Sequence, residues 1–113
     1  MSLLERLPHL CTAKRRRRTP DGMGGFTDAY PTVLFTDKAC WVQRASDAEI
    51  HFWQQRSASV SHRIYFAEDP GVGADCVIEQ GGWRYEVISE ASPDASVGLG
   101  LLWRVMVSQL EEI

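Results

Sequence analysis

Two adjacent glycines, Gly81-Gly82, separate two short runs of alternating apolar and polar residues, and this pattern limits the possible folds more than any other feature of the chain. Glycine readily adopts positive φ angles, so the pair favours a two-residue turn between antiparallel strands. The turn places Gln80 opposite Trp83 and Glu79 opposite Arg84. One face carries the Glu79/Arg84 pair, and we expect the other face to point into a core. The residues expected on that inner face are Cys76, Ile78, Trp83, Tyr85 and Val87.

Three further segments alternate in the same way and predict additional strands. They are Val60 to Phe66, Leu99 to Leu110 and Val33 to Gln43. Apolar residues occupy both faces of the Leu99 to Leu110 segment, so both should be covered. The Val33 to Gln43 segment is expected to bend or bulge near Asp37-Lys38.

A single segment has helical character. Ser46 and Glu49 form a capping box, in which each side chain can accept a hydrogen bond from the backbone amide of the other residue. A short helix from Asp47 to Arg56 is predicted, with a mobile loop as the alternative. Trp53 could either pack beneath this helix or serve as an exposed anchor for a partner. The predicted fold is therefore mainly β, with one short helix or long loop between strands.

The chain length of 113 residues allows one domain, here residues 1–113, with residues 1–10 as an N-terminal arm. The longest apolar run, Val97 to Trp103, is only seven residues and contains two glycines. Since a spanning helix needs about twenty apolar residues, no membrane segment is expected. Acidic Glu5 and a broken apolar run also differ from the basic start and apolar stretch of a signal peptide.

Four consecutive arginines, Arg15, Arg16, Arg17 and Arg18, form the most conspicuous charged feature. Such a run can neutralise nucleic-acid phosphates. However, side chains alternate between the faces of a strand, so at most two of the four should point the same way. A charge-protected edge strand, or an arm docked on an acidic neighbouring subunit, explains the run without nucleic acid.

Charge is also distributed unevenly along the chain. Residues 1–56 hold nine Lys/Arg against six Asp/Glu, whereas residues 57–113 hold three against nine. This asymmetry suits head-to-tail self-association. Alternatively, folding brings the two halves together and the asymmetry disappears from the surface.

No pattern of catalytic or metal-binding residues appears. The three cysteines, Cys11, Cys40 and Cys76, are widely spaced, which argues against a disulfide framework and favours buried thiols. The three histidines lack the spacing of a zinc site, and no cysteine or serine lies in a nucleophile signature. We therefore expect neither enzymatic activity nor a metal or cofactor.

The order of these motifs resembles the head-tail joining, or stopper, proteins of long-tailed bacteriophages and related gene transfer agents. The matching motifs cover about residues 11–110. In chain order, they are a basic strand at Cys11 to Arg18, an Asp-x-x-Gly-Gly type turn at Asp21 to Gly25, a Trp-bearing strand at Ala39 to Val42, a polar helix or loop at Ser46 to Ser57, a Ser-His-Arg-Ile strand at Ser61 to Tyr65, a hairpin from Asp75 to Ile88, and a strand of apolar alternation at Leu101 to Val107. The family usually has a tryptophan soon after the Gly-Gly turn, where this chain has Tyr30-Pro31.

This resemblance implies a small antiparallel β-barrel or sandwich that assembles into a structural ring, a hexamer or dodecamer. The ring would lie beneath the portal and adaptor at the head-tail interface of a virion assembled in the bacterial cytoplasm. The ring would contact the portal or adaptor and the tail proteins, and double-stranded DNA would pass through or be retained in its lumen without sequence specificity. Arg15 to Arg18 are the expected subunit or adaptor contacts. The loop at about Arg44 to Ser59 would gate the channel, with these candidate residues: Ser46, Asp47, Glu49, His51, Trp53, Gln54, Gln55 and Arg56.

A second function from another class is compatible with the same residues. The chain could be a stand-alone β-barrel that binds oligonucleotides through Arg15 to Arg18 and exposed aromatic rings. Nucleic-acid affinity without any connector partner would distinguish this function from the structural one.

Overall fold

The computed structural model describes residues 7–94 and 102–113, and within them it contains seven strands and one short helix. The fold is mainly β, as predicted. In chain order, the elements are β1 (His9–Pro20), β2 (Phe26–Arg44), α1 (Asp47–Gln54), β3 (His62–Phe66), β4 (Cys76–Gln80), β5 (Trp83–Val87), β6 (Ser92–Asp94) and β7 (Leu102–Glu112).

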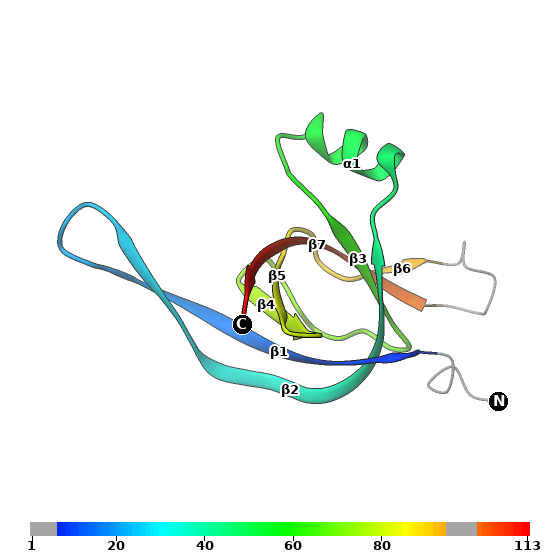
Figure 1. The fold of residues 1–113 in the computed structure, drawn as a ribbon, viewed down its shortest axis with the longest axis horizontal. Coiled ribbons are helices and arrows are strands. Elements are labelled where there is room, and N and C mark those ends of the chain that lie inside the picture. The colour runs from blue at the N-terminus through cyan, green and yellow to red at the C-terminus, as the bar shows by residue number, and fades with distance from the viewer. Residues whose placement is uncertain (1–6, 95–101) are drawn as a thin grey trace.

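The strands form one antiparallel sheet that closes on itself. Their order is β3-β2-β1-β4-β5-β7-β6, and an additional pairing of β3 with β7 closes the sheet into a small barrel. Closure pairs both edges of the main sheet and leaves the three-residue β6, which pairs only with β7, as a short edge strand. Figure 1 shows the barrel with two extensions: a long hairpin made by the distal parts of β1 and β2, and α1 above one end of β3.

The glycine hairpin has the predicted register. Gln80 pairs with Trp83, and Ile78 pairs with Tyr85. Four of the five expected inner residues are buried, but Trp83 is 38% exposed, so its inward assignment was wrong. Trp83 pairs at the very end of the hairpin, next to the turn, where the strands extend past the packed interior.

A single main core fills the barrel. Its buried members come from β1, β2, β3, β4, β5 and β7 and from the β3–β4 connection: Cys11, Ala13, Cys40, Ile64, Phe66, Val72, Cys76, Ile78, Tyr85, Val87, Val105 and Val107. A smaller cluster of Ala45, Val60 and Met106 lies outside it, beneath α1. Val105 and Met106 on β7 belong to different clusters, which confirms that both faces of this strand are covered.

Several predicted boundaries needed adjustment. The predicted helix ends at Gln54 rather than Arg56, and Ser57 adopts a positive φ of 60° just beyond it. The N-terminal arm was expected to reach residue 10, but β1 already begins at His9. The expected bend in β2 is present: Asp37 has a φ of 49°, and the β1–β2 register shifts between the Cys11 and Ala13 pairs. Residues 1–6 and 95–101, including part of the predicted Leu99 to Leu110 strand, lie outside the described residues.

Candidate functional site

The hairpin extension is a two-stranded arm, which we define as residues 17–30. Toward the barrel, β1 pairs with both β2 and β4, but its pairing with β4 covers only Thr12 to Arg15. Beyond that point, β1 and β2 pair only with each other, from Arg17 opposite Ala29 to Pro20 opposite Phe26. Figure 1 shows the arm extending well away from the barrel. An isolated two-stranded hairpin is marginally stable in water, so an arm of this kind is suited to a partner.

Three contacts hold the base of the arm against the barrel. The Arg16 amide donates to the Asp75 carbonyl oxygen at 2.8 Å, and the Arg16 guanidinium pairs with the Glu86 carboxylate at 3.0 Å. On β2, the Tyr30 ring centroid lies 4.2 Å from the guanidinium carbon of Arg84. These contacts set the direction in which the arm leaves the barrel.

The predicted arginine site is largely paired within the chain. Arg15 pairs with Asp75 at 3.2 Å, Arg16 with Glu86, and Arg18 with Asp28 at 2.9 Å. Hydrogen bonding to Arg18 lowers the pKa of Asp28. Within the described residues, only Arg17 of the four has no ion-pair partner. The run is therefore not a continuous strip of free cations, which weighs against the oligonucleotide-binding alternative.

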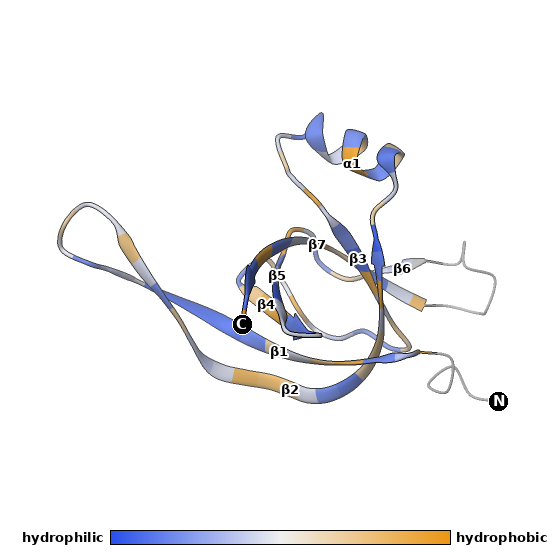
Figure 2. Ribbon diagram, in the orientation of Figure 1, coloured by the Kyte–Doolittle hydropathy of each residue, from blue (hydrophilic) through white to orange (hydrophobic). Residues whose placement is uncertain are grey.

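The arm ends in a tightly held turn. The Asp21 carboxylate accepts hydrogen bonds from the amides of Met23 at 2.7 Å and Gly25 at 3.1 Å. Asp21 also closes the loop through its own amide, which donates to the Gly25 carbonyl oxygen. Figure 2 shows that β1 is hydrophilic along the arm, whereas hydrophobic residues occur on β2 near the tip. Phe26, the first residue of β2, is 62% exposed.

The predicted gating residues lie on α1 and its two ends. Ser46 is the N-cap, and the capping box with Glu49 is formed as predicted. Trp53 packs against the cluster of Ala45, Val60 and Met106, which favours helix packing over an exposed anchor. The remaining candidates are exposed and face solvent: Asp47, His51, Gln54, Gln55 and Arg56.

Glu49 is the most constrained polar residue of this segment. One carboxylate oxygen accepts from the Ser46 amide and from Arg63 on β3. The other oxygen, Oε2, is buried without a hydrogen bond and forms an ion pair with Arg104 Nη1 at 3.8 Å. Burial raises the pKa of Glu49, but the hydrogen bonds from Ser46 and the charge of Arg63 outweigh it and leave the pKa below its ordinary value.

A pocket of about 300 Å³ lies between α1 and β7 beside this carboxylate. Its lining residues are Ala48, Glu49, Phe52, Trp53, Arg104 and Met106. The Phe52 ring is 46% exposed and is covered on one side by the Arg56 guanidinium, 3.7 Å from the ring centroid. Of these lining residues, the sequence predicted Glu49 and Trp53 as site residues but not Ala48 or Phe52. Arg104 and Met106 were also not predicted, because they reach the pocket only through strand pairing that brings distant segments together.

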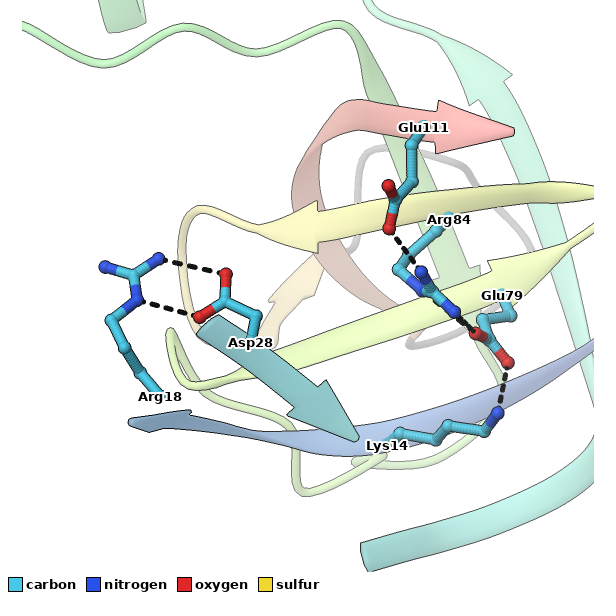
Figure 3. A network of polar contacts seen from close by, with 6 residues as sticks. All are labelled: Lys14, Arg18, Asp28, Glu79, Arg84 and Glu111. Carbon is cyan, nitrogen blue, oxygen red and sulfur yellow. Dashed lines mark hydrogen bonds and ion pairs between the residues drawn. The ribbon is translucent and has the colours of Figure 1, made fainter. Parts of the chain in front are cut away.

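A second polar network links four strands across the outside of the barrel. Glu79 on β4 binds Lys14 on β1 at 2.8 Å and Arg84 on β5 at 2.7 Å, and Arg84 also binds Glu111 on β7. Figure 3 shows this chain of alternating charges, with the Arg18–Asp28 pair of the arm nearby. Burial opposes ionisation of Glu79, but bonds from Lys14 and Arg84 lower its pKa overall. Of these contacts, the sequence had indicated only the Glu79/Arg84 pair.

Folding also joins the two oppositely charged halves of the chain. Four cations of residues 1–56 pair with four carboxylates of residues 57–113. These pairs are Lys14–Glu79, Arg15–Asp75, Arg16–Glu86 and Lys38–Glu68. The alternative in which the charge asymmetry disappears on folding is therefore favoured over charge-driven head-to-tail pairing.

The cysteines and histidines form no cluster that could hold a metal ion within the residues described. Cys11, Cys40 and Cys76 are free, buried thiols, as expected. Contact with Cys40 and burial raise the pKa of the Cys11 thiol. The His9 Nδ1 atom accepts a hydrogen bond from the Val42 amide, and the His62 ring packs edge-on against Tyr85.

No protein-family model matches the sequence, and no curated protein is significantly similar to it. Across the described residues, no helix is long and apolar enough to cross a membrane.

Proposed function

We propose that this chain is a structural head-tail connector of the stopper type, which forms a ring in a phage or gene transfer agent particle. The observation that carries the proposal is the combination of a small closed barrel with a long arm that pairs with nothing else in the described chain. The order of arm, barrel and intervening helix agrees with the order of motifs on which the family resemblance rests.

The barrel and the arm have complementary roles in this proposal. Because the β3–β7 pairing closes the sheet, the barrel itself leaves only the edge of the three-residue strand β6 for uncontrolled association. The arm does offer unpaired strand edges and exposed apolar residues, held in a fixed direction by Arg16 and Tyr30. A rigid extension that is costly to leave uncovered is suited to a permanent subunit contact.

The helix between β2 and β3 is the proposed channel element. Apart from Ala48 and Phe52 at the pocket, its exposed residues are polar, and both signs of charge are present, with Asp47 at its start and Arg56 just beyond its end. Such a surface neither holds phosphates strongly nor repels them, which suits DNA that must slide. The portal or adaptor, the tail proteins and packaged DNA are the proposed partners.

Electron microscopy and sedimentation of the purified full chain test this function. We expect closed rings of six or twelve copies with a central channel. As a control, residues 17–30 are replaced by Asn-Gly, which should give a folded but monomeric barrel. A full chain that stays monomeric at all accessible concentrations, or that binds oligonucleotides tightly as a monomer, would contradict the proposal.

A further inference from the structure

The arm presents one large apolar side chain at its apex. Met23 is 91% exposed and lies between Gly22 and Gly24, which have φ angles of 80° and 86°. The Asp21 carboxylate fixes this turn through the amides of Met23 and Gly25. The side chain of Met23 is thus presented on a rigid turn, and binding would cost little backbone ordering.

The pocket beside α1 matches such a side chain in size and chemistry. Its volume of about 300 Å³ is at the lower end of the range for ligand pockets, so one or two protein side chains suit it better than a large organic molecule. Phe52, Trp53 and Met106 give it an apolar, aromatic wall. Methionine is flexible and makes favourable sulfur contacts with aromatic rings.

We propose that the arm tip of one copy docks on the next copy, with Met23 in the pocket between α1 and β7. The tip and α1 lie on different sides of the molecule, so one chain cannot make this contact with itself (Figure 1). The two surfaces differ, and a contact between unlike surfaces closes into a ring when the rotation permits. This inference rests on the proposed function and identifies the subunit contact within the ring.

Two substitutions, one on each surface, test the contact by light scattering after size-exclusion chromatography. Met23→Asp places a charge at the tip, and Ala48→Trp fills the pocket from the exposed side of α1. We expect each variant to be monomeric at concentrations at which the wild type forms rings, with unchanged unfolding in urea. Leu110→Asp, at an exposed apolar position on β7, is the matched control and should still form rings.

Mixing the two variants gives the decisive measurement. The tip of the Ala48→Trp variant is intact, and so is the pocket of the Met23→Asp variant, so the mixture should form two-chain complexes but no rings. Should Ala48→Trp unfold, Phe52→Lys is the replacement pocket variant. Rings formed by Met23→Asp, or a mixture of folded variants that stays monomeric, would overturn the contact while leaving the ring function in place. Absence of rings in the wild type would overturn both.

Discussion

Tyr85 and Trp83 show how far alternation predicts the environment of a single residue. Both were assigned to the inner face of the hairpin, but Tyr85 is 4% exposed and packs against His62, whereas Trp83 is 38% exposed. Tyr85→Ala should lower the free energy of unfolding by about 3–5 kcal/mol, the usual cost of removing a large buried aromatic ring. Trp83→Ala should cost about 1 kcal/mol because much of its surface is already in water. Urea unfolding of both variants measures the difference, and equal losses would contradict the assigned faces.

Glu49 gives the molecule a defined response to acid. Its pKa is lower in the folded chain than in the unfolded chain, so ionised Glu49 stabilises the fold above its ordinary pKa of about 4.3. That contribution is lost as the pH falls through the lower, folded value. We expect the hydrogen-exchange protection of α1 amides to decrease as the pH falls below the ordinary glutamate pKa of about 4.3, and Glu49→Gln to weaken this pH dependence. An unchanged profile in the variant would show that other carboxylates control the helix.

The residue-scale predictions succeeded where the evidence was local in sequence. Ser46 and Glu49 are three residues apart, so their capping box could be recognised directly and is present. The unsatisfied oxygen of Glu49 could not be predicted, because its surroundings depend on Arg63 and Arg104 from strands that meet only after the barrel closes. Trp83 was misassigned because alternation specifies a face but not where the packed interior ends.

At the scale of elements, the β4–β5 turn should depend on backbone conformation alone. Gly81 and Gly82 have φ angles of 61° and 83°, and a Cβ at either position would meet no atom within 4 Å. Replacing either glycine by alanine should therefore cost about 1–2 kcal/mol through left-handed backbone strain. Gly73→Ala is the control, since Gly73 has no positive φ and only ordinary contact with Asp75. Similar losses in urea unfolding for all three variants would contradict this explanation.

Strand lengths were harder to predict than strand positions. The sequence predicted a strand from Val33 to Gln43, but β2 begins at Phe26 and continues through Pro31. Proline lacks a backbone donor and is tolerated at a bulge or an edge. Pro31 lies next to the arm, at the register shift between the Arg15 and Arg17 pairs, where β2 has β1 as its only partner. The three-residue strand β6 was not predicted, because it depends on pairing with β7 rather than on its own pattern.

At the scale of the whole molecule, the distribution of charge along the sequence did not predict how the charged residues pair after folding. The opposite charges of the two halves were a reason to expect head-to-tail association, yet four intrachain ion pairs join those halves. The molecule has an extended shape of 52 × 33 × 21 Å because the arm projects from the barrel (Figure 1). The sequence indicated a turn at Asp21 to Gly25 but not the length of the strands on either side of it. The proposed association therefore relies on the apolar tip and pocket instead of net charge.

The proposed channel role makes a final prediction about α1. Deleting Ser46 to Ser57 would remove the proposed gate together with Ala48, Phe52 and Trp53 of the pocket. Point substitutions are therefore needed to test the gate without changing the proposed ring contact. His51, Gln54 and Gln55 are exposed and do not line that pocket. A variant with Gln54→Glu, Gln55→Glu and His51→Ala should still form rings. The added negative charge should repel the phosphates of packaged DNA and weaken the retention of that DNA in the head. Purified tailless heads carrying this variant should lose packaged DNA to added nuclease sooner than wild-type heads. Equal retention would place the gate elsewhere, with the Glu68 to Gly73 loop as the next candidate.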